Sequence, residues 1–318
     1  MKPKRRSTPA GEHRPVLPLE VLEALKPQAG AIAVDCTLGF GGHAVELLQR
    51  IGPSGLLIGL DVDAEHLPAV RQRLTEVGHP FELHHANFAG LDRILAGRRA
   101  DVILADLGMS SMQVDDPNRG FSYARDGALD MRMDRSRGKT LSALLANIDE
   151  TELSKALADL ADEPNAGPIA SAIVQARGEG EITTTRQLSD IIRKAAGATK
   201  KWRLHPTTGK WNLHPAARTF QALRILLNRE LASLGQLLRV LPSCLAPAGR
   251  AAIISFHSGE DRLVKLSFQQ GMRAKVYQAG SDECLRARSD ERIQNPRSRS
   301  AKLRWAQTVG LGLAGRVR

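Results

Sequence analysis

The 318-residue chain is 42% hydrophobic and has a formal net charge of +11, which allows one large domain with a buried core and a smaller second domain. No window approaches the roughly 20 uninterrupted apolar residues of a membrane-spanning helix, and the basic N-terminus lacks the apolar run of a signal peptide, so we expect a cytoplasmic protein. The three cysteines, Cys36, Cys244 and Cys284, and the nine histidines show no metal-ligand spacing, so we predict neither disulfides nor a bound metal.

The positive charge is concentrated at the two ends of the chain. Residues 1–14 hold five basic residues and one acid, and residues 286–318 hold nine and two, so the body between them is formally neutral. Basic ends on a neutral body predict arms that neutralise the phosphates of a nucleic acid. The alternative is that the charged ends only keep the protein soluble.

Short apolar runs alternate with helical segments in the first third of the chain. The expected strands are Ala31–Cys36, Leu56–Asp61, Phe81–Ala86, Asp101–Asp106 and, much later, Ala251–Phe256. Stretches of helical composition, such as Ala64–Val77, join the first four strands. This alternation is typical of a parallel α/β sheet.

The alternation stops after the fourth strand. From about Gln113 to His214, a loop-rich start is followed by helical patterns only. Thr185 is expected to cap a helix that runs to Ala196, and helical patterning resumes at Ala216–Val240. The pattern therefore predicts an α/β fold, a doubly wound Rossmann-like sheet interrupted by a mostly helical insert.

We expect two domains from this organisation. Residues 1–113 and 215–318 would form the discontinuous sheet domain, and residues 114–214 the insert. In open α/β sheets, ligands bind beyond the carboxyl ends of the strands. The residues that follow each strand are therefore the candidates for a binding site.

All five expected strands are followed by residues that can bind a ligand. These segments are Asp35–His43, Asp61–Asp63, Asn87–Phe88, Asp106–Ser111 and His257–Asp261. They carry glycines, carboxylates, aromatic rings or hydroxyls, whereas the runs before them are mainly aliphatic. Packing alone does not account for that contrast.

The segment after the first strand is a glycine loop. Gly39, Gly41 and Gly42 lack Cβ atoms, so the backbone can turn tightly and a ligand can approach it. A helix that starts near His43 would point its free N–H groups at that ligand. Asp61, 22 residues beyond Gly39, can accept hydrogen bonds from the ribose hydroxyls of an adenosine.

The glycine loop by itself leaves the cofactor open. Phe88 is expected to lie against an adenine ring. However, the stretch from Gly39 to Ala44 also fits the G-x-G-x-x-G/A fingerprint of NAD enzymes, which would indicate an NAD-dependent oxidoreductase. A third interpretation is that the glycines only permit a tight turn.

Longer blocks of sequence resemble a known family. In chain order these blocks are His13–Leu17, Asp35–His43, Asp106–Gln113, Arg119–Ser122, Leu129–Met133, His214–Arg224, Ile254–Arg262 and Asn295–Arg304. Together they resemble the bacterial family of 16S rRNA cytosine-N4 methyltransferases, RsmH or MraW. Blocks of nine or more residues are far more specific than a glycine triplet.

The resemblance implies S-adenosylmethionine as the cofactor and a decoding-centre cytidine of 16S rRNA, in the small ribosomal subunit, as the methyl acceptor. It implies that Gly41, Gly42 and His43 contact the cofactor and that Asp61 holds its ribose. Phe88, Asp106 and Gln113 would complete that site. It also implies that the sheet domain binds the cofactor and that the insert recognises the substrate. Lys201–Leu213 reads as sequence added to the family pattern.

Asp106, after the fourth strand, is the candidate catalytic residue. The exocyclic amine of cytosine is a poor nucleophile because its lone pair is delocalised, so in-line positioning is essential. A carboxylate that accepts a hydrogen bond from this amine can draw out the lone pair and take the proton. The alternative is that Asp106 only binds the cofactor.

Several residues are candidates for contact with the RNA. They are Ser110, Ser111, Arg132, Arg218, Arg224, His257, Arg297, Arg299 and Lys302, with Arg304 in the same basic patch. The alternatives are that the serines cap the loop, that Arg218 or Arg224 forms an internal ion pair, and that His257 is structural. A ribosome-assembly factor that binds RNA without catalysis is the remaining alternative function.

Overall fold

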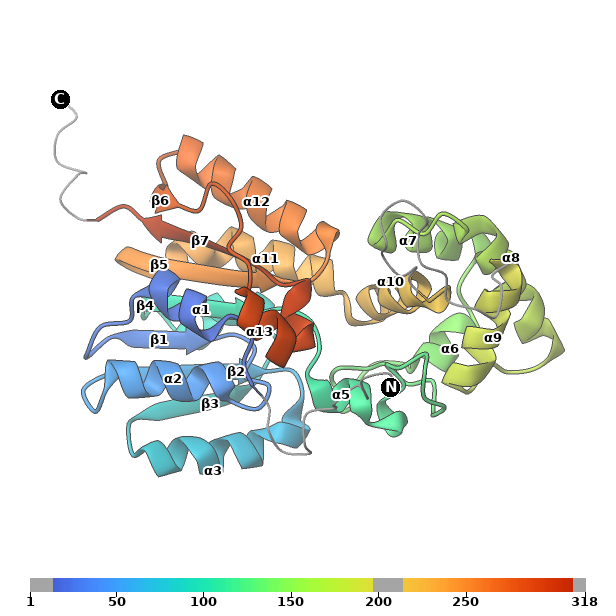
Figure 1. Cartoon of the computed structure of the whole chain (residues 1–318), viewed down its shortest axis with the longest axis horizontal. Coiled ribbons are helices and arrows are strands. Elements are labelled where there is room, and N and C mark those ends of the chain that lie inside the picture. The colour runs from blue at the N-terminus through green and yellow to red at the C-terminus, as the bar shows by residue number, and fades with distance from the viewer. Residues whose placement is uncertain (1–13, 197–213, 311–318) are drawn as a thin grey trace. The chain divides into compact units, whose positions relative to one another are not determined.

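The computed structural model describes residues 14–196 and 214–310, and the chain divides into two compact units (Figure 1). The sheet unit comprises Met1–Gly108 and Ala232–Arg318, and the helical unit comprises Met109–Leu231. The insert after the fourth strand is thus confirmed. The compact helical unit spans residues 109–231, whereas the predicted insert spans residues 114–214, and the helix Ala216–Asn228 packs on the other helices of the unit.

The sheet has seven strands in the order β3-β2-β1-β4-β5-β7-β6. They are β1 Ile32–Asp35, β2 Leu56–Asp61, β3 Phe81–His85, β4 Ala100–Asp106, β5 Leu245–Ser255, β6 Tyr277–Gly280 and β7 Lys302–Thr308. The first five pair in parallel, whereas β7 is antiparallel to both of its neighbours. The five expected strands are confirmed, while β6 and β7 were not predicted.

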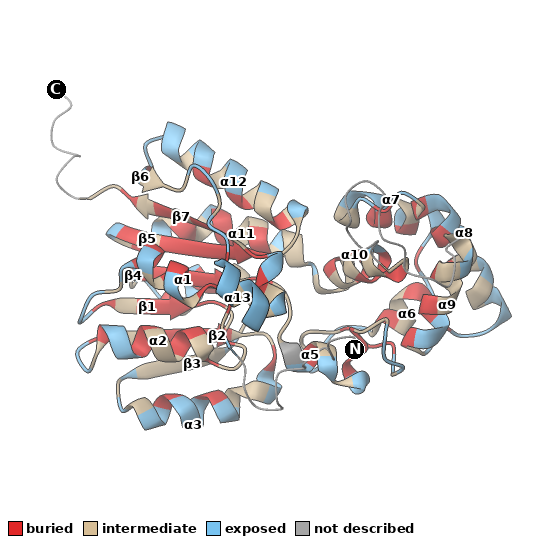
Figure 2. Ribbon diagram, in the orientation of Figure 1, coloured by how far each residue is buried: buried red, intermediate tan, exposed pale blue. Residues whose placement is uncertain are grey.

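Helices cover both faces of this sheet. The helices are α1 Pro18–Leu25, α2 Gly42–Ile51, α3 Leu67–Val77, α4 Leu91–Leu95, α11 Glu230–Cys244, α12 Ser258–Arg273 and α13 Ser289–Gln294. In β1, Ala33 packs with α1, α2 and α3, whereas Val34 packs with α4, α11 and α12. Because successive side chains point to opposite faces, both faces are apolar, and the strands β1, β2, β4 and β5 are largely buried (Figure 2).

The helical unit has a hydrophobic core of its own. Its helices are α5 Ser111–Asp115, α6 Leu141–Leu145, α7 Glu150–Ala161, α8 Ala166–Glu179, α9 Thr185–Ala195 and α10 Ala216–Asn228. Leu153, Ile173 and Leu223, from three of these helices, belong to this one buried cluster. In residues 14–196 and 214–310, no helix is long and apolar enough to cross a membrane.

One local prediction about a helix is wrong. The N-cap of α9 is Thr184, whose hydroxyl accepts the N–H of Gln187, because Thr185 instead donates its hydroxyl to the carbonyl of Arg125. The helical pattern expected over residues 216–240 is confirmed, and it forms two helices because Arg229 adopts a left-handed φ of 52° and ends α10. Residues 201–213, which read as added sequence, and the basic residues 1–13 lie outside the described residues.

Candidate active site

The glycine loop connects β1 to α2 as expected. Gly39 and Gly41 have left-handed φ angles of 49° and 77°, which residues with a Cβ atom rarely adopt. A Cβ atom at Gly41 would also lie 3.0 Å from the Val70 side chain. α2 begins at Gly42, so His43 lies in its first turn, where unpaired backbone N–H groups favour negatively charged ligand groups.

Asp61 joins this loop to the end of β2. Its Oδ2 accepts the N–H of Gly39 at 2.7 Å, and its Oδ1 accepts the N–H of Asp63 at 2.8 Å. Burial raises the pKa of this carboxyl, and the two backbone hydrogen bonds oppose that rise. Each carboxylate oxygen keeps a second lone pair, so Asp61 can still accept hydrogen bonds from ribose hydroxyls.

Two buried carboxylates lie at the ends of the neighbouring strands β1 and β4. The N–H of Asp106 donates to Thr37 Oγ1 at 2.6 Å, and the N–H of Thr37 donates to Asp35 Oδ1 at 3.0 Å. Asp35 Oδ2 and Asp106 Oδ1 are buried and have no hydrogen-bond partner among the described residues. Thr37 thus links the backbone of Asp106 to the carboxyl group of Asp35, and one carboxyl oxygen of each aspartate stays available.

The surroundings of these two groups favour their protonated forms. Burial raises the pKa of Asp35 to about 7, although the N–H of Thr37 opposes the rise. Burial also raises the pKa of Asp106 well above its ordinary value, and the negative charges of Asp35 and Glu260 add to the rise, while Arg297 lowers it. A cation near these oxygens would favour their ionised forms.

His43 approaches the same pair from α2. Its Nε2 lies 3.7 Å from Asp106 Oδ2, and the side chain is buried. In the described part of the chain, no group of three or more His, Cys, Asp or Glu side chains is placed to ligate a metal ion. The chemistry offered at these strand ends is therefore hydrogen bonding and proton transfer by carboxylate and imidazole groups.

His257, after β5, is the N-cap of α12. Its Nδ1 accepts the N–H of Glu260 at 3.4 Å, and Glu260 Oε2 accepts the N–H of Phe256 at 2.8 Å. Glu260 Oε1 lies 3.2 Å from His257 Nε2. This reciprocal capping box gives His257 the structural role that was the alternative to RNA contact.

Phe88 opens a short 3-10 helix, Phe88–Gly90, after β3. Asn87 caps this turn by accepting the N–H of Ala89 at 2.8 Å, and its Nδ2 donates to Ser233 Oγ at 3.2 Å. The Phe88 ring is partly buried against the core face formed with α4 and α11. Its contact with an adenine ring stays a prediction.

The predicted residues Ser110, Ser111 and Gln113 lie in the helical unit, not with the glycine loop in the sheet unit. Ser110 Oγ accepts the N–H of Gln113 at 3.2 Å, and Gln113 Oε1 accepts the N–H of Ser110 at 3.0 Å. This capping box starts α5, whose first residue is Ser111. The capping alternative is thus confirmed for Ser110.

The arginines expected on the RNA are engaged within the helical unit. Arg224 forms a bidentate ion pair with Glu230, with both N–O distances 2.8 Å, which confirms the alternative of an internal pair. Arg218 Nη1 donates to the carbonyl of Asp162 at 2.5 Å. Arg132 forms a bidentate pair with Asp130. RNA contact by these arginines stays a prediction.

The C-terminal basic patch is divided between the sheet and a turn. Lys302 and Arg304 lie on β7 and both pair with Asp261, at 2.9 and 2.7 Å. Arg304 is buried, so it does not belong to an exposed patch as predicted. Arg297 and Arg299 lie on the 3-10 helix Pro296–Arg299, where Arg299 Nε donates to a backbone carbonyl at 3.1 Å.

Sequence comparison assigns the family. The MraW methylase family matches residues 10–309 of the chain. The chain belongs to this family. It is 44% identical to "Ribosomal RNA small subunit methyltransferase H 2" of Alkaliphilus metalliredigens, over 94% of this chain and 86% of that protein. It is 43% identical to "Ribosomal RNA small subunit methyltransferase H" of a Geobacter species, over 93% and 98%.

Membership of the MraW methylase family confirms the predicted enzyme class, an S-adenosylmethionine-dependent methyltransferase, over the NAD-dependent oxidoreductase and the non-catalytic factor. The residues present fit this cofactor. Asp61 offers acceptors for a ribose, and the buried Asp35 Oδ2 and Asp106 Oδ1, which lack partners in the described residues, suit a ligand with positive charge.

Three residues of this site escaped the sequence prediction. Asp35 and Thr37 lie inside the glycine-loop block, and Glu260 lies inside the block after β5. The signal for Asp35 was its place at the end of an aliphatic strand, directly before the loop. Its coupling to Asp106 depends on the parallel pairing of β1 with β4, which brings the two strand ends together.

Proposed function

We propose that this chain transfers a methyl group to the N4 amine of a decoding-centre cytidine in 16S rRNA, presented by the assembled or nearly assembled small ribosomal subunit. The relatives, named ribosomal RNA small subunit methyltransferases over nearly the whole chain, support rRNA as the substrate. The single observation that carries the chemistry is Asp106, a carboxylate with a buried oxygen and a raised pKa at the end of β4.

Asp106 is the proposed proton acceptor. When bound, S-adenosylmethionine supplies a methyl group that the sulfonium already activates. Asp106 Oδ1 accepts a hydrogen bond from the N4 amine, which draws the nitrogen lone pair out of conjugation with the ring. The N4 nitrogen would take the methyl group as the bond between that methyl carbon and the sulfonium sulfur breaks, and the amine proton would pass to this oxygen. Asp106 accepts the proton in its ionised form, which the positive charge of the bound cofactor would favour against the raised pKa.

The neighbours of Asp106 hold it in position for this step. Thr37 Oγ1 fixes the backbone N–H of Asp106, and His43 Nε2, 3.7 Å from Oδ2, lies on the other side of the carboxyl group. The negative charges of Asp35 and Glu260 raise its proton affinity. The site thereby favours proton uptake at Asp106 without a metal-bound base.

The remaining assignments follow from this function. The sheet unit would bind S-adenosylmethionine through Gly39, Gly41, Gly42, His43, Asp61 and Phe88, and the helical unit, with Gln113 at its start, would recognise the RNA. Arg297 and Arg299, exposed or partly exposed on their turn, remain candidates for phosphate contact. We place the enzyme in the cytoplasm, where ribosomal subunits assemble.

The deciding experiment is methyl transfer from labelled S-adenosylmethionine to unmodified small ribosomal subunits and, separately, to naked 16S rRNA. The methylated nucleosides are then identified by mass spectrometry. N4-methylcytidine at one site, formed preferentially on subunits, is the expected result. A different methylated nucleoside would overturn the proposed acceptor, and equal transfer to naked rRNA would overturn the proposed substrate form.

A further inference from the structure

A basic loop in the helical unit holds three cations, besides Arg132, to which no role has been assigned so far. Residues 130–139, here called the arginine loop, read Asp-Met-Arg-Met-Asp-Arg-Ser-Arg-Gly-Lys and hold four basic and two acidic residues. They lie in no helix or strand. The loop is therefore a local concentration of positive charge within the insert that was predicted to recognise the substrate.

The two acids of the arginine loop are largely covered, whereas three of its four cations are exposed. The side chains of Asp130 and Asp134 are only 9% and 14% exposed. Those of Arg135 and Arg137 are 41% and 69% exposed, and Lys139 is also exposed. Arg135 Nε lies 3.7 Å from Asp130 Oδ2 and Arg137 Nε lies 2.6 Å from Asp134 Oδ2, so these two exposed cations are also anchored by ion pairs to the covered acids.

The covered acids define the shape of the loop. Asp130 accepts the Nε and Nη2 groups of Arg132 at 2.7 and 2.9 Å, and also its backbone N–H at 3.1 Å. Arg132 Nη1 donates to the carbonyls of Arg135 and Gly138 at 3.2 and 3.3 Å. Arg132 therefore closes the loop from inside, and its charge is partly neutralised by Asp130.

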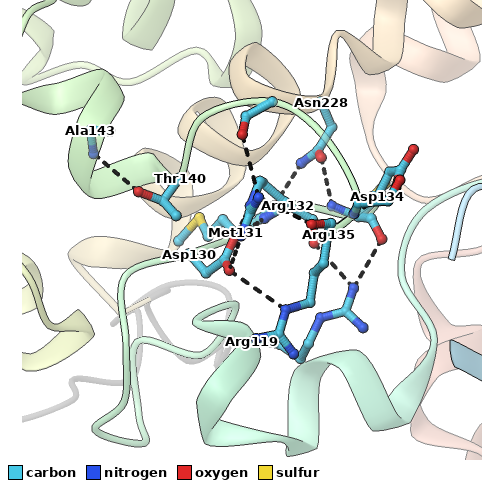
Figure 3. A network of polar contacts seen from close by, with 12 residues as sticks. Arg119, Asp130, Met131, Arg132, Asp134, Arg135, Thr140, Ala143 and Asn228 are labelled. Atoms are coloured by element: carbon cyan, nitrogen blue, oxygen red, sulfur yellow. Dashed lines mark hydrogen bonds and ion pairs between the residues drawn. The ribbon is translucent and has the colours of Figure 1, made fainter. Parts of the chain in front are cut away.

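A buried arginine and a partly buried asparagine outside the loop fix it to the helical unit (Figure 3). Arg119, only 2% exposed, donates Nη2 to the carbonyls of Arg132 and Met133 at 3.1 and 3.0 Å. Asn228 on α10 donates Nδ2 to the carbonyl of Met131 at 2.9 Å and accepts the N–H of Met133 at 2.8 Å. Together, these hydrogen bonds hold the backbone of residues 131–133.

The backbone held by these contacts is itself strained. Met131 is fully buried and has a left-handed φ of 57°, a conformation that a residue with a Cβ atom rarely adopts. A loop that only carried solvated charge would need neither this conformation nor a buried arginine beneath it. Such strain persists where the surrounding contacts over-determine the geometry, which is common at ligand-binding segments.

We propose that the arginine loop binds the phosphate backbone of the substrate RNA, with Arg135, Arg137 and Lys139 as the contacting cations. Arg119, Arg132 and Asn228 are positioning residues that hold these cations in a fixed array before the RNA arrives. A fixed array loses less side-chain and loop freedom on binding than a flexible tail does. The proposal rests on the proposed function only in taking RNA as the substrate.

The test compares a triple variant with a control of equal charge change. In the test variant, Arg135, Arg137 and Lys139 all become glutamine. In the control, three exposed cations of the same unit, Lys155, Arg186 and Lys194, become glutamine. The binding of unmodified 16S rRNA is measured from about 0.05 to about 0.3 M salt, and S-adenosylmethionine binding is measured alongside.

The test variant is expected to lose about 30- to 100-fold in RNA affinity at about 0.1 M salt. The slope of log affinity against log salt should fall by about 2–3, since each lost phosphate contact removes about 0.7–0.9. The control should change affinity less than about threefold, and both variants should bind S-adenosylmethionine like the wild type. Equal losses in test and control would overturn the proposal, because net charge alone would then explain them.

Asn228→Ala tests the positioning role without changing any charge. RNA affinity should fall about tenfold or less, while the salt slope decreases because the three cations no longer meet phosphates together. An unchanged slope and affinity would contradict the positioning role.

Failure of the loop proposal can be distinguished from failure of the proposed function. If the wild-type enzyme makes N4-methylcytidine and the triple variant binds RNA normally, only the loop proposal is overturned. Loop-dependent binding without N4-methylcytidine overturns only the proposed function.

Discussion

Two sets of carboxylates, one in each unit, are bonded in opposite ways. In the sheet unit, the buried Asp35 and the partly buried Asp106 each keep one buried oxygen without a hydrogen-bond partner among the described residues. In the helical unit, both oxygens of Asp130 and of Glu230 accept hydrogen bonds from an arginine. The carboxylates at the ends of β1 and β4 are thus left available, whereas those of the helical-unit pairs are saturated, as is Asp261 of the sheet unit.

The difference separates carboxylates that a ligand can contact from carboxylates that hold the fold together. A buried polar atom without a partner costs about 1–3 kcal/mol, so proteins rarely keep one where no ligand supplies the missing contact. A bidentate arginine–carboxylate pair, by contrast, fixes the position of two segments and presents nothing to a ligand. We therefore expect Asp106 to take part in the chemistry, and Arg132 and Arg224 to stabilise the helical unit.

The largest expected effect comes from removing the available carboxylate. Asp106→Asn should lower kcat about 10²- to 10⁴-fold, because an amide does not take up the proton of the amine. S-adenosylmethionine affinity should change less than about fivefold. Single-turnover methyl transfer and calorimetry measure the two quantities, with exposed Asp92→Asn as the control. A kcat within threefold of wild type would assign Asp106 to the framework.

Breaking a saturated pair should instead affect stability. Arg224→Met leaves Glu230 without its partner, at a site where both side chains are 11% exposed, and should cost about 3–5 kcal/mol in the free energy of unfolding. Replacing Glu230 with leucine in the same chain should recover a large part of that loss. Urea unfolding measures both. Equal losses in the single and double variants would show that the pair is not the source of the cost.

Asp61→Ala tests whether a carboxylate of the sheet unit binds the cofactor. It removes a carboxylate that tethers the glycine loop and faces the proposed ribose, so S-adenosylmethionine affinity should fall about 100-fold. Exposed Glu65→Ala, four residues further on, serves as the control and should bind normally. Calorimetric titration decides the outcome. Retained affinity in Asp61→Ala would mean that the ribose is held elsewhere.

The smallest expected effect is a pH-dependent gain in stability for Asp35→Asn. The pKa of Asp35 is about 7 in the folded protein and near 4 in the unfolded chain, so the folded state holds the extra proton between these values. The free energy of unfolding of the wild type therefore falls as pH rises from about 4 to about 7. The variant lacks this loss, so its free energy of unfolding should rise relative to that of the wild type as the pH increases from about 4 to about 8, without cofactor.

Urea unfolding near pH 5 and near pH 8 provides the measurement for Asp35. The difference between variant and wild type should be small at the lower pH and reach its full size at the higher one. The asparagine Oδ1 can still accept the N–H of Thr37, so local geometry is retained. A difference that does not depend on pH would contradict the raised pKa.

Local patterns predicted much of the fold but not the antiparallel edge. The five expected strands are aliphatic runs, and such runs identify buried parallel strands directly. β7 escaped prediction because its sequence, Lys302–Thr308, alternates charged or polar residues with apolar ones beside an Arg/Ser-rich stretch. The charges at Lys302 and Arg304 become compatible with a strand only through Asp261, which is 41 and 43 residues away.

The candidate site, like the fold, was predicted where local motifs define it and was missed where distant or backbone contacts define it. The motifs located the glycine loop, Asp61 and Asp106 correctly at strand ends. They did not distinguish a ligand-binding polar residue from a helix cap, so Ser110 and His257, both expected on the RNA, are capping residues in the structure. A cap is defined by the backbone N–H that a side chain reaches, and residue type alone does not specify it.

The sequence by itself determined the family, the parallel sheet, the inserted helices and the position of the cofactor loop, because these depend on short-range hydrophobic periodicity and on contiguous motifs. Only the tertiary structure decided which charged groups are paired. Asp35 and Asp106 meet through strand pairing, and Asn228 reaches Met131 across 97 residues of chain. Such partners are distant in sequence, and electrostatic interactions depend on distance in space and on burial, which only the folded chain defines.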